Sequence, residues 1–295
     1  MTSDRSHTGG REAEAMVGRI AERLSASGLV LRGSFDFGER DAPPPGPDGA
    51  PARAVLLVGQ AGAAPWPHFQ TWLGGREAGI LNPLDTWCRE VIGDVALSFG
   101  ARAVSPSDRP YLPFQQWAMR AEGLRPSPLG ILMHPDFGLW HAYRGALLFS
   151  RPLGAAAAVA KAHLCDGCTD KPCLTACPVA AHSGAGFAYA DCLAHVRGAA
   201  GGACRERGCL DRNACPYGTS YRYPREVQQF HMAAFSACAQ VLLDLPEAAR
   251  RERSIGRTPV AAGTGRVLHL VHGVDHPRDR SPASRRPDDP GPPGA

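Results

Sequence analysis

The sequence predicts an α+β fold in two parts: an antiparallel sheet covered by helices, followed by a smaller cysteine-rich part. First, 295 residues suffice for two domains of ~150 residues each. Second, 44% hydrophobic and 20% charged residues are typical of a globular protein. Third, helical and alternating apolar patterns follow one another in the first half, whereas eight of the ten cysteines lie between Cys165 and Cys215.

The N-terminal part begins with an expected helix over residues 11–27, because Met16, Ile20 and Leu24 recur at a spacing of four. Gly28 ends this helix. The next expected elements are a strand at 29–37, a Pro- and Gly-rich loop at 41–52 and a buried strand at 54–58.

The clearest helix is expected between Asn82 and Gly100, with Asn82 as its N-cap and Pro83 in its first turn. An apolar stripe runs along it. The stripe consists of Leu84, Trp87, Val91, Val95 and Phe99. A strand at 101–104, a helix at 114–121 and two strands at 129–134 and 139–149, joined by a turn at 135–138, complete the expected first part.

Composition divides the remaining chain. A helix is expected at 225–243, directly after Pro224. Residues 277–295 are rich in proline and charge and, like residues 1–10, are expected to be disordered. The expected units are residues 1–10, 11–155, 156–245, 246–276 and 277–295: disorder, the α+β domain, the cysteine domain, an extension and a disordered tail.

The charge and hydropathy patterns exclude some classes of protein. A net charge of +4 is too small to favour nucleic acid as a partner. The apolar segments 154–164 and 232–245 are shorter than the ~20 residues that a membrane span needs, and no secretory signal opens the chain. We therefore expect a cytoplasmic protein with no membrane partner, where clustered cysteines more often bind metal than form disulfides.

The cysteines resemble an iron–sulfur motif. The first run is Cys165-x2-Cys168-x4-Cys173-x3-Cys177-Pro178. Bacterial ferredoxins carry C-x2-C-x2-C-x3-C-P, in which the fourth cysteine binds the other of two clusters. The second run has looser spacing: Cys192, then Cys204-x4-Cys209-x5-Cys215-Pro216. The pattern predicts a ferredoxin-like domain with two [4Fe–4S] clusters.

The ferredoxin crossover gives each cluster four ligands. Cluster one takes Cys165, Cys168, Cys173 and Cys215, and cluster two takes Cys177, Cys192, Cys204 and Cys209. Two zinc sites with four cysteines each, or disulfides, are the alternatives for the same thiols. Lys171, one of two lysines in the chain, lies inside the first run and is either a cation near a cluster or a solvated loop residue.

The region from Cys165 to Pro216 resembles the twin-cluster domain of epoxyqueuosine reductases and, more distantly, of reductive dehalogenases. In those families the clusters pass electrons to a cobalamin held by the preceding domain. Residues 131–149, ILMHPDFGLWHAYRGALLF, resemble a segment of cobalamin-processing proteins of the cobalamin C type.

This second resemblance implies a flavin-reductase-like α+β domain, with a corrinoid or flavin near His134, Phe137, Gly138 and Arg144. The alternatives are structural. His134 is then a strand-end histidine bonded to backbone, and Arg144 a partly buried arginine with a carboxylate partner.

Together these patterns predict an iron–sulfur electron-transfer protein, in which two clusters pass low-potential electrons to a cofactor or substrate in the N-terminal domain. A corrinoid-linked reductase with a flavodoxin or ferredoxin reductase as electron donor fits this hypothesis. The alternatives are a plain ferredoxin-type carrier and a non-catalytic cobalamin- or partner-binding module with structural clusters. No catalytic residue can be named from the sequence.

Overall fold

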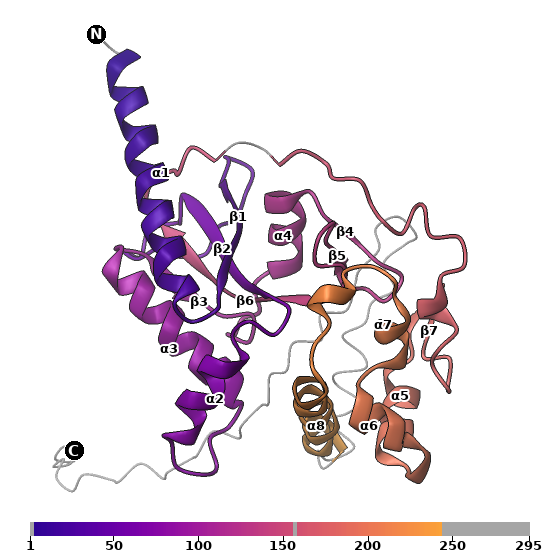
Figure 1. The fold of residues 1–295 in the computed structure, drawn as a ribbon. Coiled ribbons are helices and arrows are strands. Elements are labelled where there is room, and N and C mark those ends of the chain that lie inside the picture. The colour runs from indigo at the N-terminus through magenta and orange to yellow at the C-terminus, as the bar shows by residue number, and fades with distance from the viewer. Residues whose placement is uncertain (1–2, 156–157, 244–295) are drawn as a thin grey trace, which may run out of the picture.

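The computed structural model describes residues 3–155 and 158–243, which form two parts in contact with each other (Figure 1). The first part contains a four-stranded antiparallel sheet in the order β1-β2-β6-β3. Its strands are β1 (Val30–Asp36), β2 (Ala54–Ala61), β3 (Arg102–Val104) and β6 (His141–Phe149). The sheet and its helices agree with the expected α+β class.

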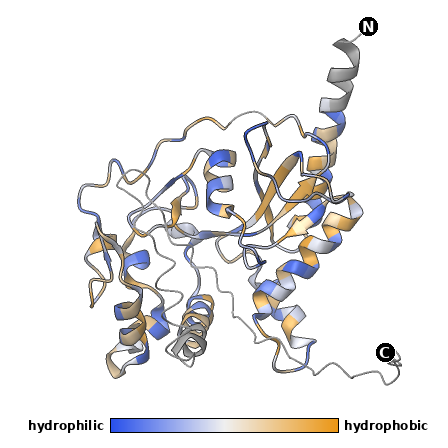
Figure 2. Cartoon of the chain, turned by 180° about the vertical axis from the view of Figure 1, so that it is seen from behind, coloured by the Kyte–Doolittle hydropathy of each residue, from blue (hydrophilic) through white to orange (hydrophobic). Residues whose placement is uncertain are grey.

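Helices cover both faces of this sheet (Figure 1). On one face lie α1 (Ser3–Ser25), α2 (Trp66–Gly74) and α3 (Pro83–Ser98), and on the other lies α4 (Phe114–Glu122). Strand β2 is apolar throughout because it is buried on both sides: Leu56 and Val58 face the first layer, whereas Val55 and Leu57 face α4. Figure 2 shows this apolar centre between the more polar helices.

Several boundaries differ from the expectation. Helix α1 begins at Ser3 rather than at residue 11, so residues 3–10 are helical where we expected disorder. Extension of an existing helix adds one hydrogen bond per residue fixed, which offsets the poor helix propensity of this segment. Helix α2 was not expected, because Trp66, Pro67 and Phe69 give no clear helical pattern.

The expected N-cap of α3 is wrong. Asn82 has left-handed backbone angles (φ 47°, ψ 55°) and makes no side-chain cap hydrogen bond. Instead, the hydroxyl of Thr86 donates to the carbonyl oxygen of Leu81 at 3.2 Å. The apolar stripe is shifted as well: Cys88 and Ile92 are buried, whereas Val91 and Phe99 are only partly buried.

The expected strand pair around residues 135–138 is also wrong. Strand β5 (Leu132–Met133) pairs with β4 (Arg125–Pro126) in a separate two-stranded sheet, not with β6. Only a single bridge, between His134 and Gly138, closes the turn. The turn therefore projects from the sheet toward the cysteine-rich part.

The cysteine-rich part consists of short elements and one long helix. These are η1 (Pro172–Leu174), β7 (His182–Ser183), β8 (Gly186–Phe187), α5 (Tyr189–Arg197), η2 (Ala199–Gly201), α6 (Gly202–Arg207), α7 (Leu210–Ala214), η3 (Thr219–Tyr221) and α8 (Arg225–Leu243). Helix α8 packs against α5 and α6, while its Phe230 meets Trp66 and Phe69 of α2. It thus joins the two parts.

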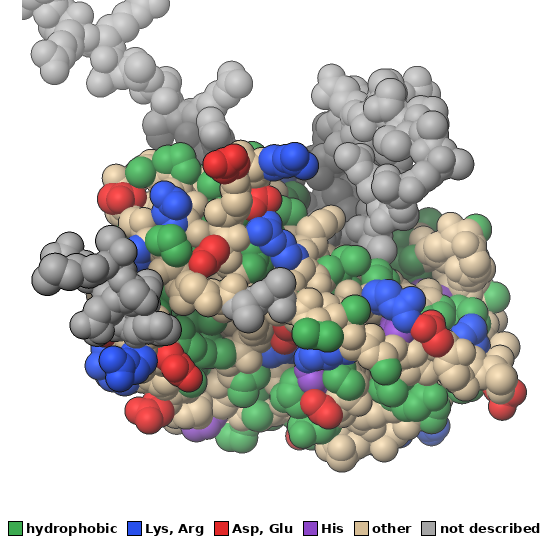
Figure 3. Space-filling view, turned by 90° about the horizontal axis from the view of Figure 1, so that it is seen from above, with side chains coloured by type: hydrophobic (Ala, Val, Ile, Leu, Met, Phe, Trp, Pro, Cys, Tyr) green, Lys and Arg blue, Asp and Glu red, His purple; other side chains and the backbone are tan. Residues whose placement is uncertain are grey.

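The expected extension at 246–276 and the expected disordered tail at 277–295 lie outside the described residues. Among the described helices, none has the length and apolar character needed to cross a bilayer. On the face shown in Figure 3, acidic and basic side chains are interspersed, and neither sign forms a broad field.

Candidate metal centres

The eight clustered cysteines form two groups of four, and the groups interleave along the chain. Members of a group are recognised because the charge of one thiolate raises the pKa of another: Cys215 and Cys168 act on Cys165 and Cys173, and Cys177 acts on Cys192 and Cys204. Among the described cysteines, no such influence joins one group to the other, and none forms a disulfide. The first group is Cys165, Cys168, Cys173 and Cys215, and the second is Cys177, Cys192, Cys204 and Cys209.

The first group lines a single narrow cavity of about 10 Å³. Burial, followed by repulsion from Cys215 and Cys173, raises the pKa of Cys165 to about 11. The remaining wall comes from Pro128, Met133, Leu139, Lys171, Pro172, Pro216 and Tyr217, together with Ser127. The cavity is therefore mostly apolar apart from its thiols and one lysine.

The second group lies between α5, α6 and α7. Burial, followed by repulsion from Cys209, Cys177 and Cys204, raises the pKa of Cys192 to about 12. Burial and Cys177 raise the pKa of Cys204 in the same way. Neither group is closed around a single metal ion, because in the described part of the chain no three or more His, Cys, Asp or Glu side chains are arranged to hold one.

Two short elements connect the groups. Each has a thiol of one group at or near its first end and a thiol of the other group after its second end. Helix α7 lies between Cys209 of the second group and Cys215 of the first. The single turn η1 contains Cys173 of the first group and is followed by Cys177 of the second. Since α7 and η1 contact each other, the two groups are neighbours.

A buried carboxylate lies between the groups. Asp211 of α7 is fully buried, and its Oδ2 is 2.8 Å from Nδ1 of His182. Its Oδ1 has no hydrogen-bond partner among the described residues. The charge of Asp211 raises the pKa of three second-group thiols and of Cys173 in the first group.

The turn expected to hold a cofactor packs directly on the first group. Leu139 and Met133 belong to the same apolar cluster as Cys215 and Cys165. The backbones also meet closely: a Cβ atom added to Gly138 would lie 2.3 Å from the carbonyl oxygen of Tyr217. Gly138 therefore serves this contact between the two parts of the molecule.

His134 and Phe137 lie together in this turn. Their rings stack with centroids 4.0 Å apart. Nδ1 of His134 accepts hydrogen bonds from the backbone N–H groups of Asp136 (3.1 Å) and Phe137 (3.2 Å), as the structural alternative for this residue anticipated. Burial and the charge of Arg32 lower the pKa of His134 to about 4, so the ring is neutral near pH 7 with its proton on Nε2.

Arg144 belongs to a different set of contacts. Its Nε donates to Oε1 of Gln60 at 2.6 Å, and Gln60 in turn donates to the hydroxyl of Tyr223 at 3.2 Å. Its charge also acts on Cys88 of α3. Among the described residues, no carboxylate lies within ion-pair distance of Arg144, so the expected alternative of a carboxylate partner is wrong.

A buried polar network next to His134 was missed at the sequence level. Arg32, 2% exposed, donates to both carboxylate oxygens of Glu122, at 2.9 and 3.0 Å. The hydroxyl of Tyr143 also donates to Glu122, and Arg32 donates to Nδ1 of His141 at 3.2 Å. No signal marked Arg32, since it is one of 30 arginines in the sequence and lies in an ordinary alternating strand.

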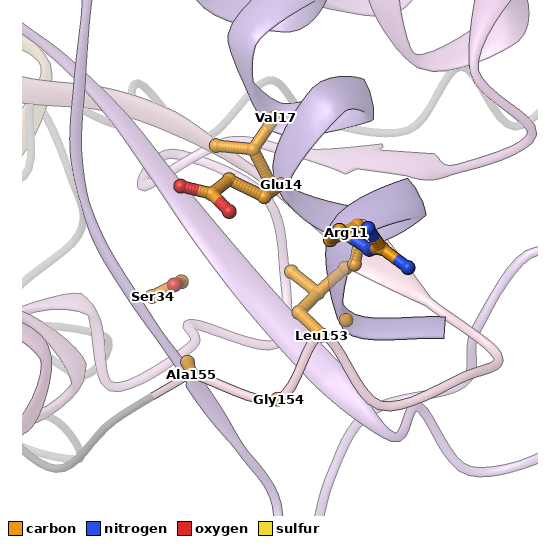
Figure 4. Close-up of a pocket in the computed structure, with 9 residues that line it drawn as sticks. Arg11, Glu14, Val17, Ser34, Leu153, Gly154 and Ala155 are labelled. Atoms are coloured by element: carbon orange, nitrogen blue, oxygen red, sulfur yellow. The ribbon is translucent and has the colours of Figure 1, made fainter. Parts of the chain in front are cut away.

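Another surface hollow lies between α1, β1 and the loop after β6 (Figure 4). It measures about 450 Å³, and Arg11, Glu14 and Ser34 are the polar side chains that line it. It contains none of the residues expected to form a site.

Comparisons with known proteins give few matches. No protein-family model matches the chain, and neither does any curated protein. Among solved structures, the chain is similar to selenomethionine-labelled epoxyqueuosine reductase, at 13% identity and a TM-score of 0.44, over 74% of this chain and 69% of that one.

Two further structures of the same enzyme are similar at 13% identity and a TM-score of 0.43. One contains an epoxyqueuosine-modified tRNA stem loop, with 74% of this chain and 69% of that chain covered. The other comes from Bacillus subtilis, with 81% and 75% covered. A TM-score below 0.5 does not establish a shared fold, and the function is therefore argued from the site.

Proposed function

We propose that the chain is an iron–sulfur electron-transfer protein that holds one [4Fe–4S] cluster in each thiol group. One observation carries the proposal: the eight thiols separate into two groups of four whose membership crosses over in the sequence. Ferredoxins with two clusters use the same crossover, in which the last cysteine of each run serves the other cluster. Electron transfer requires a short distance between the two clusters.

The chemistry of the donor set fits this cofactor. Each group offers four thiols, and thiolate sets of this kind hold [4Fe–4S] clusters. The raised pKa values reflect burial and mutual repulsion of the thiolates, and bound iron relieves both by neutralising their charge. A bound cluster supplies one-electron chemistry at this position.

The N-terminal part is the proposed destination of the electrons. The turn from His134 to Trp140 packs on Cys215, so the first group is the one next to the α+β domain. Electrons pass from a donor protein, such as a flavodoxin or ferredoxin reductase, to the second group, then to the first, and finally to a cofactor or substrate beside this turn.

A corrinoid or flavin is the proposed cofactor, held near His134, Phe137 and Arg144, whereas Gly138 packs against the backbone of Tyr217. His134 presents Nε2–H, because its Nδ1 already accepts two backbone hydrogen bonds. Arg144 is oriented by Gln60 and has no carboxylate neighbour among the described residues, which suits an anionic group such as a phosphate. These two side chains have separate contacts, so each binds a different portion of a large ligand.

Serine substitutions test the two clusters separately. We expect about eight iron atoms per chain after anaerobic reconstitution. Cys215→Ser should remove the same electron paramagnetic resonance signal as Cys168→Ser, and Cys177→Ser should remove the other. Cys88→Ala, outside both groups, is the control and should keep both signals. Stoichiometric zinc without iron, or loss of the second-group signal in Cys215→Ser, would contradict the proposal.

Binding of the organic cofactor is tested with the iron-loaded full chain. Added cobalamin or flavin should change its visible spectrum on binding, and His134→Ala or Arg144→Ala should weaken the change without loss of iron. If the unaltered chain binds neither cofactor, a plain electron carrier is the better account. Binding without turnover favours a non-catalytic module.

A further inference from the structure

We propose that Lys171 raises the reduction potential of the first cluster above that of the second, and so sets the direction of electron transfer. This inference rests on the proposed function, because it requires a cluster in each thiol group. It goes beyond that function by assigning a role to a residue that binds no iron. Three independent observations support it.

The position of Lys171 is the first observation. Lys171 lines the same cavity as the first-group thiols. Its Nζ donates to the carbonyl oxygens of Cys165 at 2.8 Å and Cys168 at 3.0 Å. The ammonium group is thus held against the loop that presents the first two ligands, and its charge acts to lower the pKa of Cys165.

The charge of Lys171 is not cancelled locally. Among the described residues, no carboxylate lies within ion-pair distance of its Nζ. Asp166, on whose pKa the charge of Lys171 acts, is already paired with Arg125. Half-burial of Lys171 limits screening by solvent, so its charge acts on the cavity more strongly than that of a surface lysine.

The backbone of Lys171 is the second observation. It has left-handed angles, φ 40° and ψ 58°, which disfavour any residue other than glycine or asparagine. Such conformations persist where the surroundings hold them, often at functional sites. Lys171 is one of only two lysines in a chain whose other 30 basic residues are arginines.

The opposite charge at the other group is the third observation. Asp211 is fully buried in α7, whose N-cap is Cys209 of the second group, and its Oδ1 has no hydrogen-bond partner among the described residues. Reduction adds one electron, and hence one negative charge, to a cluster without breaking any bond. A cation beside the first cluster favours this step, and an anion beside the second opposes it. The first cluster is therefore the better acceptor.

Lys171→Gln is the decisive variant, because the glutamine amide keeps a hydrogen-bond donor but removes the positive charge. The reconstituted full chain is titrated with dithionite, and electron paramagnetic resonance follows each cluster. We expect the midpoint potential of the signal that Cys215→Ser removes to fall, while that of the other signal stays within error. Lys171→Arg should restore the parent value, and Lys161→Gln, which alters the other lysine, should change neither.

The possible failures can be told apart. If the parent chain binds no iron, the proposed function fails. If it binds both clusters but Lys171→Gln shifts neither potential, or shifts both equally, the proposed function stands and the role of Lys171 is refuted. Loss of the first cluster in Lys171→Gln, with the parent potential in Lys171→Arg, would make Lys171 a structural anchor and would also overturn the proposal.

Discussion

Substitution of Gly138 by alanine should weaken the contact between the two parts of the molecule. Gly138 has φ +56°, a conformation that costs an alanine about 1–2 kcal/mol. The added Cβ would lie 2.3 Å from the carbonyl oxygen of Tyr217, a rigid backbone atom. Overpacking of this kind typically adds ~1–3 kcal/mol. We therefore expect the free energy of unfolding to fall by about 2–5 kcal/mol, measured by urea denaturation.

Gly100→Ala separates the two contributions. Gly100 has a similar φ of +64°, but an added Cβ would meet no atom within 4 Å. This control should cost only the ~1–2 kcal/mol of the backbone conformation. Gly218→Ala should match Gly138→Ala, because its Cβ would lie 2.3 Å from the carbonyl oxygen of Phe137. Equal losses in Gly138→Ala and Gly100→Ala would refute the close contact.

Two further predictions concern the network beside this turn. Glu122→Gln should destabilise the chain by ~3–5 kcal/mol, because it leaves the charge of Arg32 buried without a partner. Glu206→Gln, which alters an exposed ion pair, should cost at most ~1 kcal/mol in the same denaturation assay. The pKa of His134 is lowered from 6.5 to about 4, so the unfolded chain binds its proton first as the pH falls. The free energy of unfolding should therefore fall between about pH 6.5 and pH 4. His134→Gln should show a smaller fall than the parent chain over this range. An equal fall would assign the effect to other groups.

Regular elements with a strong pattern could be predicted from the sequence. The spacing of Met16, Ile20 and Leu24 located α1, and the buried run of β2 was placed correctly at its start. The predicted pairing of residues 129–134 with 139–149 failed, because a short apolar strand pairs equally well with any neighbour. In the structure, Leu132 pairs with Pro126 and Met133 pairs with Arg125.

The site could be predicted only where residue type and spacing carry the information. Cysteine spacing predicted two sets of four thiols, and their occupation by clusters stays a prediction that iron measurements test. Spacing cannot predict contacts between residues that are distant in the sequence, such as the approach of Tyr217 to Gly138 or the burial of Arg32 against Glu122. Nor could it show that Gln60, rather than a carboxylate, is the partner of Arg144.

The interleaving of the two thiol groups has a consequence for how the protein matures. Cys173 and Cys177 are made long before Cys215, yet the first group needs Cys215 and the second needs Cys209. A nascent chain that stops short of Cys209 can complete neither set. Because Cys209 and Cys215 flank α7 at its two ends, ordering of this five-residue helix positions a thiol of each set. The two centres should therefore be assembled together on a finished segment, and partial loading should be rare.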